Sequence, residues 1–287
     1  MSMDVAIVGG GPAGISAAIW CQRLGLAPTI YERESCLGGQ LQQISLPIVD
    51  LPGQPEISAT QVLHGLIAHI ERMSIPIALQ SRVIGWSGNT IHLQDGRRIF
   101  ADRVIYAPGL KNRTLDIPGQ EWISNAGTGE ILAAQRSPIL IVGGGDRALE
   151  AACRLAEAGI HVILVHWRKE FSARREFQER LQPLPVDIVR EAQVTGITRG
   201  QSGYHVRIST GTQQQREVDV ADILVRIGME PDIEPGFAIP VSQEMVPSYP
   251  RHDLLVVGDA TVAPAYRSLV AAYASGMQAA KFLVMNE

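Results

Sequence analysis

Two glycine-rich turns constrain the fold of this 287-residue chain more than any other feature. One occupies residues 9–14 (GGGPAG) after the apolar run 5–8, and the other occupies residues 143–148 (GGGDRA) after the apolar run 139–142. After each turn the pattern predicts a helix and a second short strand, which together form a βαβ unit. The turns lie about one domain length apart. We therefore expect an α/β fold with two Rossmann-like three-layer dinucleotide-binding domains.

The first turn has the spacing that a dinucleotide pyrophosphate requires. Gly9 allows the tight turn, Gly11 lets the backbone approach the phosphates, and Gly14 lets helix and strand pack closely. The free N–H groups at the start of the helix favour an anion. Glu32 ends the next strand, where a carboxylate accepts a hydrogen bond from a ribose hydroxyl. These features together predict a bound dinucleotide.

The order of the remaining segments predicts that the second domain is inserted into the first. Residues 82–102 predict one antiparallel meander, and residues 204–209 with 217–227 predict another. A strand over residues 254–257 precedes a long helix over residues 267–285, and a strand from the end of the chain is expected to complete the first sheet. The expected boundaries are residues 1–112 and 233–287 for the first domain and residues 113–232 for the second.

The composition of the chain limits the kinds of binding partner that we expect. The net charge is −4, from 25 basic and 29 acidic residues without a run of one sign, which argues against nucleic acid. No apolar stretch reaches the ~18 residues of a membrane-spanning helix, so no membrane partner is expected. The 3 cysteines are scattered and odd in number, which predicts a reducing cytoplasm rather than a disulfide scaffold. No histidine has metal-ligand spacing, so no metal is expected.

Motifs along nearly the whole chain resemble those of low-molecular-weight thioredoxin reductases in type and order. They are residues 9–14, Gly38-Gly39-Gln40-Leu41, Asp50-Leu51-Pro52-Gly53, Ala107-Pro108-Gly109, residues 143–146, Ile227-Gly228-Met229-Glu230-Pro231-Asp232, Gly258-Asp259 and Ala265-Tyr266-Arg267-Ser268. The resemblance implies a flavin-dependent oxidoreductase with FAD in the first domain. It also implies a nicotinamide nucleotide in the inserted domain and a homodimer.

The same resemblance implies which residues contact FAD. Gly39 and Gln40 would line the isoalloxazine, and Asp50 would lie near its reactive side. Val83 would lie against the adenine, and Asp259 would accept from a ribityl hydroxyl. The helix that starts near Arg267 would point its N-terminus at the flavin, where a helix dipole stabilises an anion by ~0.3–1 kcal/mol. The expected FAD-binding residues are Gly9, Gly11, Pro12, Ala13, Gly14, Glu32, Arg33, Gly39, Gln40, Leu41, Asp50, Val83, Ala107, Gly109, Gly258, Asp259, Arg267 and Ser268.

The chain departs from these reductases at the redox-active dithiol. Their Cys-x-x-Cys motif falls on residues 126–129 (AGTG), where neither position holds sulfur, so the ordinary dithiol relay is excluded. Cys36, in the loop before the Gly38-Gly39 pair, is a candidate redox residue. Cys21 and Cys153 are expected to be small buried side chains in helices, and no Cys21–Cys36 bridge is expected. No other catalytic residue is predicted.

The second glycine turn departs from the family as well. Arg147 stands where relatives have a small hydroxyl residue, and its guanidinium could pair with a pyrophosphate or lie at the surface. NADPH-using relatives bind the 2′-phosphate through His-Arg-Arg and a later arginine. Here the segment is His166-Trp167-Arg168, the later position is Ser172, and only Arg174 and Arg175 could compensate. The expected ligands in this domain are Gly143, Gly145, Asp146, Arg147, Trp167 and Arg168.

Three functions are compatible with these residues. The first is an electron-transfer flavoenzyme that takes electrons from NAD(P)H or ferredoxin and passes them to an external acceptor, with ferredoxin or a thioredoxin-like protein as redox partner. The second is a diflavin-linked disulfide oxidoreductase with a second FAD in the inserted domain, where Arg147 and Trp167 would suit a pyrophosphate and an aromatic ring. The third is a non-catalytic flavin-binding sensor.

Overall fold

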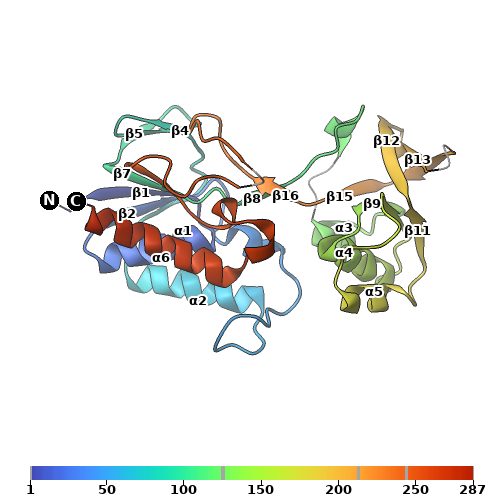
Figure 1. Cartoon of the computed structure of the whole chain (residues 1–287), viewed down its shortest axis with the longest axis horizontal. Helices are drawn as coiled ribbons and strands as arrows, with labels where there is room; N and C mark the ends of the chain where they lie inside the picture. The colour runs from blue at the N-terminus through green and yellow to red at the C-terminus, as the bar shows by residue number, and fades with distance from the viewer. Residues whose placement is uncertain (1, 124–126, 212–213, 243–244, 287) are drawn as a thin grey trace. The chain divides into compact units, whose positions relative to one another are not determined.

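The computed structural model describes residues 2–123, 127–211, 214–242 and 245–286. The chain divides into two compact units (Figure 1). The outer unit comprises Met1–Lys111 and Glu230–Glu287, and the inserted unit comprises Asn112–Met229. Each unit has its own parallel sheet, so the expected α/β class with one dinucleotide-binding fold inserted into another is confirmed.

The sheet of the outer unit is parallel throughout. Its strand order is β17-β7-β1-β2-β3. The strands are β1 (Asp4–Val8), β2 (Ala27–Tyr31), β3 (Ile77–Ala78), β7 (Arg103–Tyr106) and β17 (Leu254–Val256). Nearly every residue of β1, β7 and β17 is buried, as in a sheet covered on both faces. The strand order reverses between β1 and β7, and ligands of open α/β sheets bind at such a switch point.

Helices and a small antiparallel sheet cover the two faces of this sheet. The helices are α1 (Pro12–Arg23), α2 (Ala59–Arg72) and α6 (Leu269–Met285), and the antiparallel strands are β4 (Val83–Ser87), β5 (Thr90–Leu93) and β6 (Arg98–Phe100). Figure 1 shows the three helices on one face and the β4–β6 meander on the other. One apolar core accordingly joins α1 and α6 to the sheet, and a second joins β4 and β5 to it.

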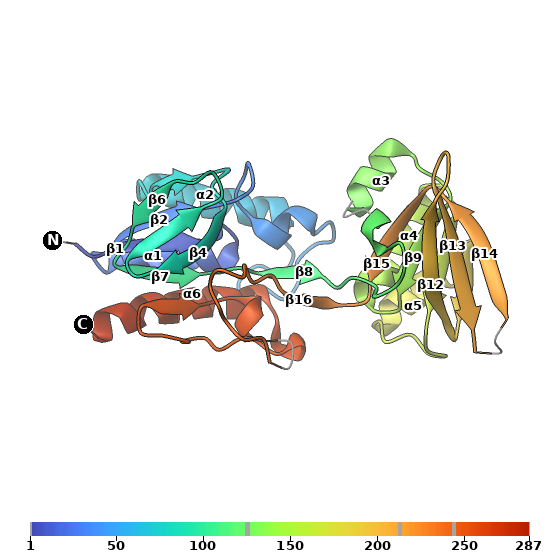
Figure 2. The same ribbon diagram turned by 90° about the horizontal axis from the view of Figure 1, so that it is seen from above.

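The inserted unit repeats the three layers. Its parallel sheet has the order β11-β10-β9-β15. The elements are α3 (Thr128–Ala134), β9 (Ile139–Gly143), α4 (Asp146–Glu157), β10 (Val162–His166), α5 (Arg175–Leu181), β11 (Val186–Arg190), β12 (Ala192–Arg199), β13 (Tyr204–Thr210), β14 (Gln215–Val220) and β15 (Asp222–Arg226). Figure 2 shows the antiparallel β12–β14 sheet on one side of the parallel strands and the helices on the other.

One sequence expectation was wrong. Residues 217–227 were expected to belong to a single meander, but they form two strands in different sheets. β14 ends at Val220, and β15 joins β9 in parallel with Arg226 opposite Gly143. The burial pattern explains the split, because Asp222 to Val225 are buried without a break, as in a parallel strand covered on both faces.

Two short strands mark where the chain crosses between units. β8 (Leu110–Asn112) and β16 (Met229–Pro231) pair with each other as a two-stranded sheet. The described residues also form the short 3-10 helices η1 (Gly39–Gln43), η2 (Gln120–Trp122), η3 (Asp259–Thr261) and η4 (Pro264–Tyr266). Within the described ranges, none of the helices combines the length and apolar character needed to cross a membrane.

Candidate functional site

The glycine turn of the outer unit lies at the switch point of its sheet. A Cβ on Gly9, whose φ is +107°, would lie 2.3 Å from the carbonyl oxygen of Ala107. A Cβ on Gly14 would lie 1.9 Å from the carbonyl oxygen of Gly9. Gly11 has no described neighbour within 4 Å of that position, so its side of the turn is open. The turn therefore packs tightly against β7 and leaves an open side that a phosphate can approach.

Glu32 holds the turn itself. The residue is only 6% exposed, and its Oε2 accepts the Gly10 N–H at 2.6 Å. The other oxygen, Oε1, accepts the Glu34 N–H at 2.9 Å. Each carboxylate oxygen can accept a second hydrogen bond, so this arrangement leaves capacity for the expected ribose contact. The structure adds a role that the sequence pattern did not predict, because the carboxylate fixes the backbone of the glycine turn.

The loop that follows β2 returns to the same turn. The Gly38 N–H donates to the Gly10 carbonyl at 2.9 Å. Gly39 has a φ of +52°, and a Cβ there would lie 3.3 Å from the Gly11 Cα. The expected flavin-loop residues Gln40 and Leu41 continue from this point in η1, with Leu41 buried. The structure thus brings the 38–41 segment and the first glycine turn together.

Asp259 presents a buried oxygen that no described residue satisfies. It follows Gly258, where a Cβ would lie 3.0 Å from the Ala13 Cβ at the start of α1. Burial raises the pKa of the Asp259 carboxyl, and the Arg267 charge opposes that shift. The Oδ1 atom has no hydrogen-bond partner in the described structure. A buried acceptor without a donor costs ~1–3 kcal/mol, so a ligand hydroxyl at this position would be stabilising, and the site fits FAD.

The start of α6 lies beside Asp259. Arg267 donates through Nε to the carbonyls of Asp259 and Val262, both at 3.2 Å. Ser268 caps the helix because its Oγ accepts the Ala271 N–H at 3.1 Å. Arg267 and Ser268 are therefore held at the same end of the sheet as the glycine turn, as the family resemblance implied.

The other expected FAD ligands of the outer unit differ in burial and in their partners. Val83 is 3% exposed and belongs to the core between the meander and the sheet, and Asp50 is exposed. Arg33 forms an ion pair with Asp232 at 2.7 Å. Burial, the largest single influence, lowers the pKa of Arg33, but the hydrogen bond to Asp232 and the nearby carboxylate charges together outweigh it, and the pKa is raised. Gly109 accepts the Asp232 N–H through its carbonyl at 3.2 Å.

The turn of the inserted unit has the same construction. A Cβ on Gly143 would lie 2.3 Å from the carbonyl oxygen of Arg226, the same clearance that Gly9 has in the outer unit. A Cβ on Gly144 would lie 2.4 Å from Nδ1 of His166, whose ring therefore lies against the turn. Gly145 is the N-cap residue of α4. Both glycine turns thus end the central strand of a parallel sheet and begin a helix.

The side chains expected around the nucleotide ribose form hydrogen bonds within the inserted unit. Arg174 donates to Asp146 through its N–H and its Nε, both at 2.7 Å. Arg175 donates to Glu179 at 2.7 Å. The Ser172 Oγ donates to the Gly144 carbonyl at 3.2 Å. Both arginines that could replace the missing phosphate ligands are therefore paired with carboxylates.

His166 ends β10 and is buried, whereas Trp167 follows the strand and is exposed. Trp167 is 56% exposed, and the Arg168 guanidinium lies 4.2 Å from the centre of its ring. His166 is buried, with Nε2 3.0 Å from the Glu170 carbonyl and Nδ1 without a partner in the described structure. Burial lowers the pKa of His166. The imidazole is therefore held neutral beside the turn.

Arg226 is a site residue that sequence reasoning missed. It ends β15 and lies opposite Gly143 in the parallel pairing, in a segment that had been expected to be part of a meander. The only sequence signal is the unbroken apolar run that precedes it, which is typical of a buried parallel strand. Arg147, which was expected at this site, is partly buried and donates to the Asn112 side chain at 2.8 Å.

The three cysteines are free, so the expected absence of a Cys21–Cys36 bridge is confirmed. Cys21 and Cys153 are buried, and burial raises both pKa values, that of Cys21 to about 12. Cys36 is exposed, and Gln42 donates to its sulfur at 3.6 Å. The segment aligned with the family dithiol begins at Ala126, outside the described residues, and continues as Gly127, Thr128 and Gly129 at the start of α3.

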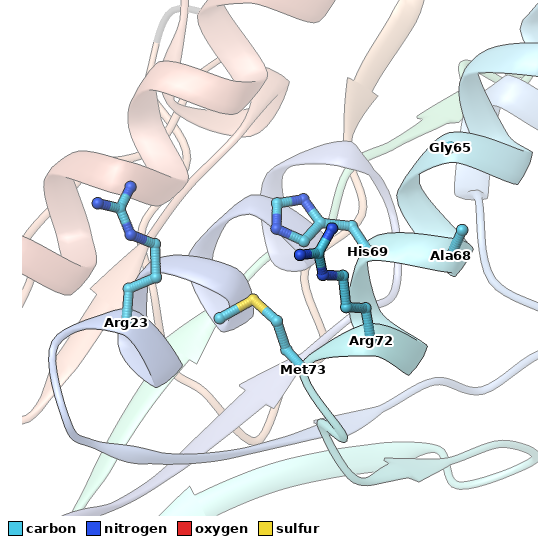
Figure 3. Close-up of a pocket in the computed structure, with 6 residues that line it drawn as sticks. All are labelled: Arg23, Gly65, Ala68, His69, Arg72 and Met73. Carbon is cyan, nitrogen blue, oxygen red and sulfur yellow. The ribbon is translucent and has the colours of Figure 1, made fainter.

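A separate hollow of about 580 Å³ lies at the other end of the outer unit (Figure 3). Its lining residues are Arg23, Gly65, Ala68, His69, Arg72 and Met73. They lie at the C-terminal ends of α1 and α2, where basic side chains complement the negative end of the helix dipole. That dipole opposes binding of an anion, so the basic lining is accounted for by helix stability. In the part of the chain that the structure describes, no three His, Cys, Asp or Glu side chains group as metal ligands.

The comparison with protein families decides the family of this chain. The model of the family described as pyridine nucleotide-disulphide oxidoreductase matches residues 3–276. The chain belongs to this family. Membership confirms the expected resemblance to thioredoxin reductase-like flavoproteins and the expected flavin-dependent oxidoreductase. It also implies FAD, the expected cofactor, together with pyridine-nucleotide binding.

Individual members of the pyridine nucleotide-disulphide oxidoreductase family agree with this assignment. A ferredoxin–NADP reductase of Gluconacetobacter diazotrophicus is 30% identical over 256 residues, which cover 82% of this chain and 74% of that protein. An NADH dehydrogenase of Ferdinandcohnia aciditolerans is 27% identical over 80% of this chain but only 46% of its own length, so the chain spans about half of that relative. The crystal structure of Lactococcus lactis thioredoxin reductase in its FR conformation has a TM-score of 0.85 at 25% identity and covers 99% of this chain and 100% of that one.

Proposed function

We propose that this chain transfers electrons from a reduced donor to an external acceptor through FAD, without an internal dithiol. FAD occupies residues 1–112 with 233–287, and a reduced nicotinamide nucleotide occupies residues 113–232. The observation that carries the proposal is the matched pair of glycine turns. In each unit a Cβ on the first glycine would lie 2.3 Å from a backbone carbonyl of the neighbouring chain segment, so the turn packs closely against the sheet. The third glycine is open, because a Cβ on Gly11 would meet no described atom within 4 Å and one on Gly145 would meet its nearest at 3.8 Å, which leaves room for a ligand to approach the backbone.

The residues of the outer unit bind and orient the flavin. The Gly9–Gly14 turn and the start of α1 hold the pyrophosphate through backbone N–H groups. Asp259 accepts a hydrogen bond from a ribityl hydroxyl through the oxygen that is otherwise unsatisfied. The N-terminus of α6 favours negative charge beside it. When bound, FAD supplies the two-electron chemistry, and the chain needs no acid–base pair for that step.

A second candidate is the diflavin-linked oxidoreductase. The observation that favours it is the pairing of Arg174 with Asp146 and of Arg175 with Glu179, which engages the groups that would replace the missing 2′-phosphate ligands. The exposed ring of Trp167 offers a stacking surface for any planar heterocycle. A second FAD would use the same glycine turn and would need no 2′-phosphate ligand.

Flavin counting and anaerobic reduction separate these functions. The purified chain is assayed for FAD per polypeptide and then mixed without oxygen with NADH, NADPH or reduced ferredoxin. One flavin per chain that bleaches with NADH or NADPH supports the principal proposal. Two flavins that resist both nucleotides support the diflavin enzyme. One flavin that ignores every donor supports a non-catalytic sensor, and a colourless chain that stays so with added FAD contradicts all three.

Assembly, compartment and partner complete the proposal. We propose a homodimer in the cytoplasm that passes electrons to a small redox protein such as ferredoxin or a thioredoxin-like protein. The three free cysteines suit a reducing compartment, and the resemblance to thioredoxin reductases supports the dimer. Light scattering coupled to size exclusion measures the assembly, and a mass of one chain at micromolar concentration would contradict the dimer.

A further inference from the structure

The position of the Asp259 carboxylate depends on the turn that follows β17. Gly258 begins this turn with a φ of +83°, and a Cβ on it would lie 3.0 Å from the Ala13 Cβ at the start of α1. The Oδ1 atom of Asp259 is buried and has no hydrogen-bond partner in the described structure. Because no described group holds that oxygen, its direction depends on how the backbone of the turn is held.

Ser275 in α6 holds the backbone of this turn. Its Oγ accepts the N–H of the buried Gly258 at 2.9 Å. The same hydroxyl donates its proton to the Ala272 carbonyl, about one helical turn earlier, at 2.8 Å. A serine hydroxyl has a single proton and can otherwise only accept, so the contact with Ala272 fixes Ser275 as an acceptor toward Gly258. The hydroxyl is therefore oriented from both sides.

The other hydrogen bonds of the turn come from residues nearer in the sequence. The Gly258 carbonyl accepts the Thr261 N–H at 3.0 Å and the Thr261 hydroxyl at 2.9 Å. The Asp259 carbonyl accepts from Arg267 Nε at 3.2 Å, just before α6 begins. Thr261 thus closes the turn on itself, and Arg267 links it to the segment before the helix. Ser275 ties the turn to the helix itself.

Helix α6 is packed closely on α1. A Cβ on Gly276 would lie 2.7 Å from the Ala17 nitrogen, and the Ser16 hydroxyl donates to the Tyr273 carbonyl at 2.7 Å. Because α1 begins directly after the first glycine turn, these contacts fix α6 relative to the expected pyrophosphate site. The turn after β17 is thereby tied, through α6, to the element that carries that site.

We propose that Ser275 is a positioning residue for FAD binding. Its hydrogen bond holds the Gly258–Asp259 turn so that Asp259 Oδ1 meets a ribityl hydroxyl while the pyrophosphate lies on the first glycine turn. Two contacts with one ligand need a fixed separation, because a hydrogen bond weakens steeply as its geometry departs from the optimum. The inference rests on the proposed FAD site and adds a residue that acts through Asp259 and not by contact with the cofactor.

FAD titration of the apoprotein in a double-mutant cycle tests this role. Ser275→Ala leaves the buried Gly258 N–H without its acceptor, and we expect FAD binding to weaken about tenfold. In an Asp259→Ala background the same change should alter FAD affinity by less than about twofold, because the contact through which Ser275 acts is already absent. Ser275→Thr keeps a hydroxyl at this position and should bind FAD within about threefold of the parent.

Ser16→Ala is the matched control, because it removes a serine hydroxyl from the same contact between α1 and α6 and leaves the Gly258–Asp259 turn unchanged. It should keep FAD affinity within about twofold of the value for each background. Melting temperatures of all the apoproteins separate binding from folding. A serine with only a structural role would lower the melting temperature and weaken FAD binding by the same factor with or without the Asp259 carboxylate.

The outcomes separate this inference from the proposed function. A loss that is large beside Asp259 and small without its carboxylate supports the positioning role. Unchanged FAD affinity in Ser275→Ala, or equal losses in both backgrounds, overturns that role and leaves the FAD site intact. A Ser275→Thr variant that melts like the parent but binds FAD as weakly as Ser275→Ala overturns it as well. A parent apoprotein that takes up no FAD overturns the proposed function itself.

Discussion

The buried polar side chains around the two glycine turns differ in how many of their hydrogen-bonding atoms have a partner. Glu32 and His166 stand at the same distance in sequence from the first glycine of their turns and pack against the second glycine of each. Glu32 uses both oxygens in hydrogen bonds, whereas His166 leaves one ring nitrogen and Asp259 leaves one oxygen without a partner in the described structure. Buried groups of this kind are where ligand binding and pH act most directly.

Asp259→Asn is expected to separate apoprotein stability from FAD affinity. Burial raises the carboxyl pKa in the folded state, so the folded protein holds more protons than the unfolded chain and loses stability as the pH rises above the unfolded value. The asparagine amide does not ionise, so this pH-dependent loss of stability disappears. The variant apoprotein should therefore be more stable than the parent apoprotein at neutral pH. It should also bind FAD about tenfold more weakly or worse, because a charge-assisted hydrogen bond is lost.

Chemical unfolding of apoprotein at several pH values and FAD titration check this expectation. Asp253→Asn, at an exposed surface position of the same segment, is the control. An Asp259→Asn variant with parental FAD affinity would contradict the assigned ribityl contact.

His166→Gln is expected to reduce the acid sensitivity of the inserted unit. Burial lowers the pKa of His166, so the unfolded chain binds a proton that the folded protein does not. The stability contributed by the neutral imidazole is fully present above the unfolded pKa of ~6.5 and is lost as the pH falls from that value through the lower pKa of the folded state. Thermal melts between about pH 7 and about pH 5 measure the slope, with His64→Gln in the outer unit as control. A variant slope equal to that of the parent would refute the linkage.

Elements differ in how far local sequence predicts them. The strand, turn and helix of each glycine unit were predicted because their signals are contiguous. β15 was not, because its assignment depends on pairing with β9, far away in the sequence, and not on its own alternation. α2 was also missed, although a local signal exists. Ser58 and Gln61 form a capping box directly before the amphipathic helix.

The close contact between α1 and α6 depends on Gly276, which has no side chain. A Cβ on Gly276 would lie 2.3 Å from the Ala13 carbonyl oxygen and 2.7 Å from the Ala17 nitrogen. The Ser16 hydroxyl donates to the Tyr273 carbonyl at 2.7 Å across the same contact. Because the facing atoms are helix backbone, they cannot move aside without separating the two helices.

Gly276→Ala should therefore destabilise the outer unit by ~1–3 kcal/mol, since the added methyl group overpacks the helix contact. Denaturant unfolding followed by circular dichroism measures the change. Gly65→Ala in α2 is the matched control because no described atom lies within 4 Å of its added Cβ. That control should stabilise the chain by ~0.5–1 kcal/mol through helix propensity. Equal effects of the two substitutions would contradict close helix packing.

The whole molecule consists of two dinucleotide-binding folds, one inserted into the other. The order of motifs predicted two nested dinucleotide folds, and the family comparison agrees over residues 3–276. The site was predicted less completely. Sequence spacing pointed to Gly9 and Glu32, the family resemblance pointed to Asp259, and Arg226 beside the second glycine turn was missed. Burial and pairing across a sheet depend on the complete fold, which spacing along the chain does not encode.

A chain without cysteine should retain electron transfer to an artificial acceptor. We expect Cys21→Ala, Cys36→Ser and Cys153→Ala combined to keep NAD(P)H oxidation within about twofold of the parent. Buried Cys21 and Cys153, whose pKa values are raised, hold little thiolate, and the proposed route through FAD uses no thiol at Cys36. Anaerobic and steady-state turnover at matched FAD content measure this. Loss of turnover in Cys36→Ser alone, with FAD retained, would assign a redox role to that thiol.

The pairing of β8 with β16 bears on how the inserted unit could be exchanged during evolution. Both ends of the inserted segment, near Asn112 and Met229, meet in one two-stranded connection. A foreign domain whose own termini lie equally close could be exchanged at these two positions without rebuilding the five-stranded sheet or its flavin turn. Exchange of the inserted unit could then change the electron donor while the outer unit is kept.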